Sequence, residues 1–192
     1  VFILPKYIQE MIENKWLGQK SGQGFYKKID KGVIHSLDLK TLEYKPMNKK
    51  RHSAYALAKE KTYVRDRIKA IVKSDDNAGE FLWKTFSRTL MYAANLIGEI
   101  ADDVCSIDSA MKWGFGWEIG PFEVLDAIGV DYFIERCKTD GMTIPNWILS
   151  MQKQNNKSIY ILLDGKKYFY DINKKDYVAY NCHKKYIDFN LF

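Results

Sequence analysis

The sequence is poor in the residues that mark secreted or metal-binding proteins. Its 192 residues include three histidines and three cysteines, Cys105, Cys137 and Cys182. The cysteine count is odd, the spacings are wide, and neither a CxxC nor an HxxxH pattern occurs. We therefore expect neither a disulfide framework nor a metal site, and reduced thiols in a cytoplasmic protein are the simplest interpretation.

Long apolar runs are also missing. No run approaches the roughly 20 apolar residues that a helix needs to cross a bilayer. Residues 1–5 are apolar, but they lack a basic stretch and a small-residue cleavage site, so we do not expect a signal peptide. A membrane is accordingly not an expected partner.

The chain is instead rich in hydrophobic and aromatic residues and carries a net positive charge. The hydrophobic fraction is 46% and the aromatic fraction is 15%, which is enough to build a core. The net charge is +6, and much of the excess lies in residues 45–73 and 166–185. A basic surface can bind a polyanion or can be a solvated face. Nucleic acid is not an expected partner, and a basic module that binds nucleic acid or a protein stays open as the alternative function.

Hydrophobic periodicity predicts a mainly α-helical chain with short β-hairpins in its tails. The Asp164-Gly165 pair between two apolar runs is a strong signal for one of these hairpins. The predicted helices cover about 5–14, 54–73, 78–101, a short segment from 106 or 108 to 113, 121–128, 131–140 and 145–153, and the strand pairs cover 25–29 with 33–37 and 159–163 with 167–170.

The boundaries of the helices are predicted from capping signals. Asn77 can cap the longest helix, with Glu80 completing a capping box, and an apolar stripe from Phe81 to Ile97 is expected to be buried. Pro5, Pro121 and Pro145 stand at helix starts, and Gly129 and Gly141 at helix ends. Asp131 is the expected cap of the helix that follows Gly129.

Two distant segments repeat one another. Residues 4–11 and 144–151 share a proline, an aromatic residue, an isoleucine and a methionine in register. Aromatic-rich strand segments follow each copy, and an Asp with a later Tyr recurs in 38–44 and 171–177. The repeat predicts a chain organised as the tail of one unit, a linker, and a second unit with a similar tail.

Two motifs point to one family. The first is LGQKSGQGFY at residues 17–26, and the second is IDSAMKWGFGWEIGPFE at residues 107–123, which continues to Asp126 and Gly129. Together they resemble the C-terminal domain of the 3-hydroxyacyl-CoA dehydrogenases of fatty-acid β-oxidation. In one copy of that domain the GPFE block precedes the GxKxGxGFY block, whereas the order here is reversed.

The reversed order predicts parts of two such domains. Residues 1–44 are the expected tail of a first domain, 45–58 a basic linker, 59–180 a second domain, and 181–192 a further tail or linker. The second domain is degenerate, because its tail lacks the lysine-glycine loop and keeps only a YFYD echo at residues 168–171.

The resemblance also implies a fold and an activity. It implies a helical domain like the C-terminal domain of 6-phosphogluconate dehydrogenase, and a parent enzyme that oxidises 3-hydroxyacyl-CoA to 3-oxoacyl-CoA with NAD. The implied partners are an NAD-binding domain outside this chain, an enoyl-CoA hydratase domain, the acyl-CoA substrate and a second subunit. No strand–GxGxxG–helix unit occurs, and no histidine stands beside a matching carboxylate motif. We therefore expect no catalytic, cofactor-binding or metal residue in this chain, which should be inactive alone.

Two groups of residues remain as candidates. Gly18, Lys20, Gly22 and Gly24 could hold a phosphate of the acyl-CoA through backbone amides, and the other interpretation is a tight turn that needs glycine. The second group is a structural motif, in which Glu123 suits the first turn of a helix. Its members are Asp108, Gly116, Gly120, Pro121, Phe122, Glu123, Asp126 and Gly129. The tryptophans Trp113, Trp117 and Trp147 are expected to be core or interface anchors.

Overall fold

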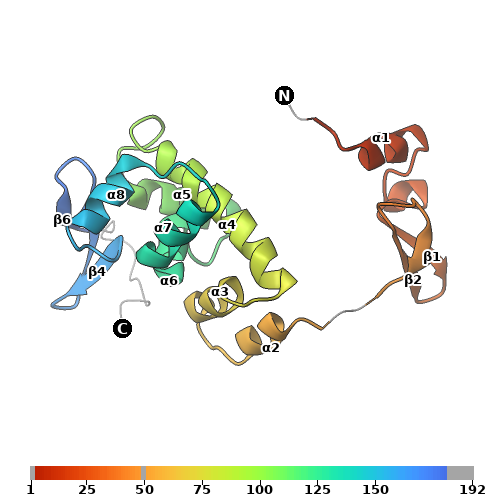
Figure 1. Cartoon of the computed structure of the whole chain (residues 1–192), viewed down its shortest axis with the longest axis horizontal. Coiled ribbons are helices and arrows are strands. Elements are labelled where there is room, and N and C mark those ends of the chain that lie inside the picture. Colours follow the sequence, from red (N-terminus) through yellow and green to blue (C-terminus); the bar gives the residue numbers. More distant parts are fainter. Residues whose placement is uncertain (1–2, 49–50, 181–192) are drawn as a thin grey trace. The chain divides into compact units, whose positions relative to one another are not determined.

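A computed structural model describes residues 3–48 and 51–180 of the chain. These residues form two compact units that divide between Arg51 and His52 (Figure 1). The boundary falls inside the segment for which a linker was predicted, although that segment also contributes a strand to the first unit and a helix to the second. The proposed tail or linker at 181–192 lies outside the described residues.

The first unit is a short helix followed by a small sheet. The helix starts after Pro5, which is the capping residue rather than the first helical residue that the sequence suggested. The three strands are antiparallel in the order β1-β2-β3, and the third was not predicted because it lies in the supposed linker. The elements are α1 (Lys6–Glu13), the 3-10 helix η1 (Gln19–Ser21), β1 (Tyr26–Asp30), β2 (Val33–Leu37) and β3 (Tyr44–Pro46).

The second unit is a bundle of helices followed by another small sheet, which confirms the mainly α-helical fold. Its tail sheet is antiparallel in the order β4-β5-β6, and Asp164-Gly165 forms the predicted hairpin turn between β4 and β5. The elements are α2 (Ser53–Lys59), α3 (Val64–Val72), α4 (Asn77–Asn95), α5 (Val104–Phe115), α6 (Pro121–Ile128), α7 (Val130–Thr139), α8 (Asn146–Lys153), β4 (Tyr160–Leu163), β5 (Lys166–Asp171) and β6 (Asp176–Ala179).

The single helix predicted over 54–73 is wrong, because α2 and α3 are separate. The break between them is held by Arg67, whose guanidinium donates to the carbonyl oxygens of Lys61 at 2.8 Å and Thr62 at 3.1 Å. These carbonyls have left the helical hydrogen-bond ladder, so the arginine fixes the turn that separates the two helices.

The cap of α4 is Asp76 rather than Asn77. The Asp76 carboxylate accepts hydrogen bonds from the amides of Ala78 and Gly79, each at 3.0 Å, which is the standard N-cap arrangement. It also accepts from the amide of Ala54 at 3.0 Å and so ties α2 to α4. Glu80 forms ion pairs instead of a capping box, and the helix ends at Asn95, earlier than predicted.

Three further expectations are corrected. The helix α5 starts at Val104, where Asp103 caps it through the Ser106 amide, so neither Ser106 nor Asp108 is its cap. Gly129, not Asp131, is the residue at the start of α7. Phe81 is 68% exposed, so it does not belong to the core. Trp113 is 70% exposed and lies outside the core, so its role as an interface anchor stays a prediction.

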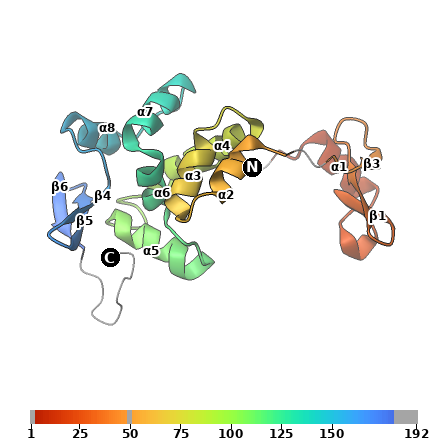
Figure 2. The ribbon, with the colours of Figure 1, turned by 90° about the horizontal axis from the view of Figure 1, so that it is seen from below.

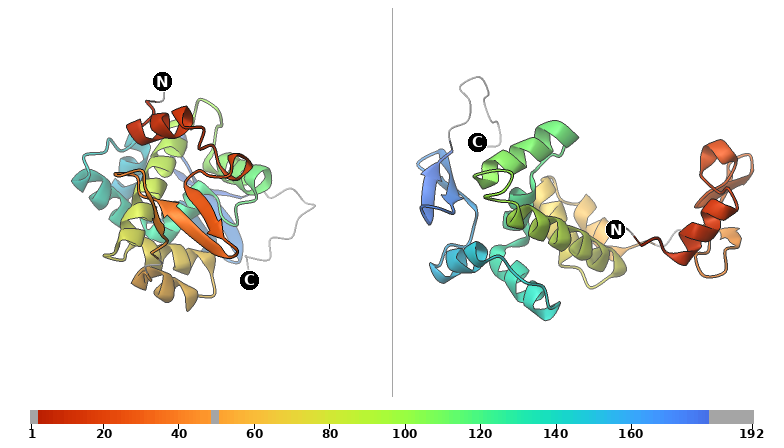
Figure 3. Two further views of the ribbon diagram at one scale, coloured as in Figure 1. Left: turned by 90° about the vertical axis from the view of Figure 1, so that its right-hand side faces the viewer. Right: turned by 90° about the horizontal axis from the view of Figure 1, so that it is seen from above.

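The core of the second unit is built from residues of the helices α3 to α8 and of the tail sheet. Trp83 on α4 is fully buried, its ring packs edge-on against Phe133 on α7, and its indole nitrogen donates to Asp140 at 2.5 Å. Trp147 at the start of α8 donates from its ring nitrogen to the Ala94 carbonyl at 3.1 Å. Figures 2 and 3 show the tail sheet beside α5 on one side of this unit. No described helix is long and apolar enough to cross a membrane.

A buried carboxylate cluster at the start of helix α6

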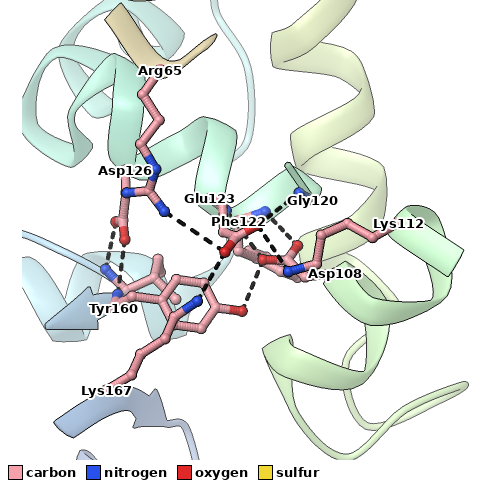
Figure 4. Close-up of polar contacts among 10 residues, drawn as sticks. Arg65, Asp108, Lys112, Gly120, Phe122, Glu123, Asp126, Tyr160 and Lys167 are labelled. Atoms are coloured by element: carbon pink, nitrogen blue, oxygen red, sulfur yellow. Dashed lines mark hydrogen bonds and ion pairs between the residues drawn. The ribbon is translucent and has the colours of Figure 1, made fainter. Parts of the chain in front are cut away.

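Side chains from five elements meet around the first turn of α6, and one of them is Arg65 from α3. Asp108 comes from α5, Glu123 from α6 itself, and Tyr160 and Lys167 from the hairpin β4–β5 (Figure 4). Asp108 is 1% exposed and Glu123 is 5% exposed, so both carboxyl groups are removed from water. Buried carboxyl groups are costly unless they are hydrogen-bonded or paired, and the partners therefore explain why these residues stand here.

Asp108 caps α6 from a neighbouring helix. One of its carboxylate oxygens accepts from the Phe122 amide at 2.8 Å, and the other accepts from the Glu123 amide at 3.2 Å. These are the second and third residues of α6, whose amides have no partner inside the helix. Pro121 is the first residue and has no amide hydrogen to satisfy. The GPFE sequence is thus a helix start that takes its cap from Asp108.

Gly120 is required by the closeness of α5. A Cβ atom built on Gly120 would lie 2.4 Å from both the Cβ and the Cγ atoms of Asp108. The φ angle of Gly120 is −79°, which any residue adopts, so the requirement is steric and not conformational. The glycine lets the Asp108 side chain reach the amides that follow Pro121.

Glu123 accepts a hydrogen bond at the start of α6 and forms ion pairs with three basic side chains. Its Oε2 atom accepts from the Gly120 amide at 3.0 Å. Its carboxylate also forms ion pairs with Lys167 at 2.9 Å, Lys112 at 3.2 Å and Arg65 at 3.7 Å. Although burial opposes it, the attraction of Lys167 and the other partners lowers the pKa of Glu123 to about 2. Glu123 is therefore ionised throughout the physiological range.

Asp126 joins the tail sheet to α6. Its two carboxylate oxygens accept from the amides of Ile159 at 2.6 Å and Tyr160 at 2.8 Å, where the chain enters β4. The Tyr160 hydroxyl then donates to Asp108 at 2.8 Å. The two aspartates and the tyrosine thus connect α5, α6 and the tail sheet in one set of bonds.

Burial dominates the acidity of the two aspartates. It raises the pKa of Asp108 to about 7, against the opposing effect of the hydrogen bonds from the Phe122 amide and Tyr160. It likewise raises the pKa of Asp126 to about 7, against the bonds from Ile159 and Tyr160. Burial also raises the pKa of the Cys105 thiol to about 12, so this cysteine is not a nucleophile.

The cluster has the properties of a structural network. No buried side-chain nitrogen or oxygen in the described residues lacks a hydrogen-bond partner. The described residues also contain no group of three or more His, Cys, Asp or Glu side chains that could hold a metal. Each oxygen of its three carboxylates is already bonded to an amide, a hydroxyl or a cation, as in a network that holds elements of the fold together.

The other predicted motif residues also have places in this unit. Phe122 is fully buried and its ring centroid lies 6.0 Å from that of Trp147. Gly116 ends α5 with a φ of 68°, and Gly129 joins α6 to α7 with a φ of 96°, values that favour glycine. All eight residues of the predicted motif thus belong to α5, α6 or their ends.

The glycine loop of the first unit is a tight turn. Gly18 and Gly22 have φ angles of 126° and 83°, and a Cβ on Gly24 would lie 2.8 Å from the Gly18 Cα. The Ser21 hydroxyl donates within the loop to the Gly18 carbonyl at 2.9 Å and accepts from the Leu17 amide at 3.0 Å. The geometry of the turn explains why glycine occurs at these positions. The side chain of Lys20 is exposed and does not contribute to this geometry. Whether the loop binds substrate stays a prediction.

Four residues of the cluster were not predicted as site residues: Arg65, Lys112, Tyr160 and Lys167. Lys112 lies inside the recognised motif, yet its contact with Glu123 depends on how the helices fold back. The Nζ atom of Lys167 also lies 4.5 Å from the centroid of the Tyr160 ring. This contact joins neighbouring strands, and no sequence motif predicts it. A sequence signal for a position in the repeated tail existed only for Tyr160, because it occupies the position in the second tail that Tyr26 occupies in the first.

Comparison with known proteins agrees with the motifs. The family model for the 3-hydroxyacyl-CoA dehydrogenase C-terminal domain matches residues 81–143. A "Probable 3-hydroxyacyl-CoA dehydrogenase" of Bacillus subtilis (strain 168) is 44% identical over 97% of this chain. Two relatives named "Putative fatty acid oxidation complex trifunctional enzyme" are more distant. The protein of Rickettsia felis is 26% identical over 76% of the chain, and that of Rickettsia prowazekii is 23% identical over 80%.

The matches cover only part of each relative. The chain spans 23% of the length of the Bacillus protein and 19% and 21% of the two Rickettsia proteins. No solved structure matches the chain significantly. The family match includes α5 and α6, the helices that carry Asp108 and the GPFE sequence. Residues 81–143 of the chain therefore match a 3-hydroxyacyl-CoA dehydrogenase C-terminal domain.

Proposed function

We propose that this chain is the C-terminal region of an NAD-dependent 3-hydroxyacyl-CoA dehydrogenase of fatty-acid oxidation. In this proposal the chain packs on the acyl-CoA side of the enzyme and supports its assembly, while hydride transfer takes place on another domain. The observation that carries it is the GPFE cluster, a family motif whose carboxylates are all bonded within the fold.

The residues of this chain do not fit a dinucleotide. The sequence contains no glycine-rich turn between a strand and a helix, and both of its described sheets are antiparallel meanders rather than the parallel sheet of a Rossmann fold. NAD would therefore be held by a separate domain of the parent protein. The relatives' printed names and greater lengths support such an arrangement, with an enoyl-CoA hydratase domain as a further partner.

A reconstitution assay tests the proposal. The purified chain alone is expected not to oxidise NADH in the presence of acetoacetyl-CoA, whereas the parent protein that contains it does so. Removing the chain from the parent is expected to lower the rate at least tenfold, because the acyl-CoA side is then incomplete. NADH oxidation by the chain alone, or full activity of the parent without it, would contradict the proposal.

The same assay tests the glycine loop as an acyl-CoA contact. Lys20 is exposed in the middle of η1, next to backbone amides of a turn with left-handed residues, a geometry that suits an anion. We expect Lys20→Ala to raise the KM for acetoacetyl-CoA several-fold and to leave kcat unchanged. Lys31→Ala, at the exposed β1–β2 turn, is the matched control. An unchanged KM in both variants would leave the loop with its structural task only.

A further inference from the structure

The tails of the two units are built alike down to single hydrogen bonds. In each tail a tyrosine on the last strand donates from its hydroxyl to the carbonyl two residues before the first strand. A backbone amide near the end of the middle strand donates to the carbonyl of the following residue, which directly precedes the first strand. These pairs are Tyr44 to Gly24 and Leu37 to Phe25 in the first tail, and Tyr177 to Ser158 and Tyr170 to Ile159 in the second.

The turns of the two tails also agree. Both tails contain a non-glycine residue with left-handed φ after the helix and another before the last strand, namely Lys15 and Leu42 in one and Asn155 and Lys175 in the other. The amides of Leu42 and Lys175 each donate to the carbonyl of an aspartate four residues earlier, at 2.7 and 2.8 Å. Residues other than glycine uncommonly adopt a positive φ angle, so the recurrence of this conformation at corresponding positions supports a structural repeat of the two tails.

The register makes Phe25 and Tyr26 the counterparts of Ile159 and Tyr160. Tyr26 pairs with Ser36 just as Tyr160 pairs with Phe169. In the second unit Ile159 is fully buried and both amides are held by Asp126.

The first unit leaves the same positions uncovered. Phe25 is 47% exposed and Tyr26 is 61% exposed, and neither amide donates to a side chain of any residue that the structure describes. Leu4, at 46%, shows the same contrast with its counterpart Ile144, at 8%. The first tail therefore has the edge that a helical body covers in the second unit, but without that body.

We propose that this edge is the docking surface for a second helical body of the same kind as α4–α7, carried by the parent polypeptide. That body places a carboxylate, equivalent to Asp126, on the amides of Phe25 and Tyr26 and covers the apolar side chains of Leu4 and Phe25. The inference rests on the proposed function, because it requires a parent protein with two family domains.

The helical body of the second unit is not a suitable occupant. Its Asp126 is already bonded to Ile159 and Tyr160, so a second tail would have to displace the first. The register also places Ile34 where the second tail has Lys167, since Ile34 pairs with Lys28 as Lys167 pairs with Leu162.

A swapped tail would therefore remove the cation nearest to Glu123, which is 5% exposed. A buried carboxylate that loses such a partner is strongly destabilised. The sequence of the first tail thus favours a body with a different charge pattern, and a second copy of this chain does not provide one.

Hydrogen exchange tests the proposal on the intact proteins. Exchange is followed by mass spectrometry on peptides that cover 25–29 and 159–163, in the full chain and in a version extended with the helical region that precedes it in the parent. We expect the amides of Phe25 and Tyr26 to exchange at least tenfold more slowly in the extended protein, and those of Ile159 and Tyr160 to be unchanged. Phe25→Asp should abolish the gained protection, whereas Lys28→Asp, at an exposed position of the strand that follows Phe25, should keep it.

Each alternative outcome has a clear meaning. Equal exchange of the first peptide in both proteins overturns the proposal. Protection in the chain alone that grows with protein concentration also overturns it, because a second copy would then be the occupant. Gained protection in the extended protein, together with full dehydrogenase activity of the parent without this chain, would sink the proposed function and leave the docking surface standing. A parent that needs this chain for activity, with no gained protection in the extended protein, would do the reverse.

Discussion

Replacing Gly120 with alanine is expected to destabilise the second unit by at least about 3 kcal/mol, the upper part of the range for overpacked sites. The added methyl group would lie 2.4 Å from Asp108 side-chain atoms and 2.5 Å from its Cα atom. The backbone of α5 cannot give way as a flexible side-chain end could. Relief therefore requires moving α5 from α6, which breaks the bonds from Asp108 to Phe122 and Glu123.

Gly114→Ala is the matched control for this experiment. Gly114 lies within the same helix α5 as Asp108, and a Cβ there meets no atom within 4 Å. Because alanine is the better helix former, this variant should be neutral or more stable by up to about 1 kcal/mol. Urea denaturation of both variants gives the comparison, and equal stabilities would show that α5 and α6 do not approach each other as described.

Asp108→Ala is expected to have the second large effect. It leaves the amides of Phe122 and Glu123 and the hydroxyl of Tyr160 without their acceptor in a buried place. Each buried donor left unpaired costs roughly 1–3 kcal/mol, so a total loss of about 3–5 kcal/mol is expected. Glu135→Ala, at an exposed position of α7, should change the stability by no more than about 0.5 kcal/mol. A small effect of Asp108→Ala would mean that water replaces the cap.

The effect of Asp108 should depend on pH. Its pKa is about 7 in the folded chain, and an unfolded chain has an aspartate pKa near 3.9, so the folded state binds the extra proton between these values. Its contribution to stability is therefore largest at low pH and falls as the pH rises from about 4 to 7, by up to about 1.4 kcal/mol per unit. The difference between the wild type and Asp108→Ala should accordingly shrink from pH 5 to pH 8. A difference that grows over this range would contradict burial as the cause.

The mainly helical fold, the tail hairpin and the family motif followed from the sequence because they depend on neighbours in the chain. Pro121 and Gly129 bound α6 through their own backbone properties, and Asp164-Gly165 forms its turn locally. The cap of α4 was placed one residue late, because Asn77 and Asp76 are both good caps and only contacts with α2 decide between them.

The charged partners of the cluster did not follow from the sequence. Lys167 is 44 residues from Glu123, and Tyr160 is 52 residues from Asp108, so their contacts depend on how the tail sheet folds back onto α5 and α6. The motif could show that Asp108 and Glu123 belong together. It could not show that burial and cations would push their acidities in opposite directions.

We propose that the carboxylate cluster fastens the tail sheet to the helices and takes no part in the reaction. The most direct test is the steady-state kinetics of Asp108→Asn in the proposed full-length dehydrogenase, well below the melting temperature of the variant. We predict a lowered melting temperature with kcat and KM for acetoacetyl-CoA within about twofold of the wild type, a difference of less than roughly 0.5 kcal/mol in the barrier. A fall in kcat of a hundredfold or more in a variant that melts like the wild type would contradict the claim and make Asp108 a participant in catalysis.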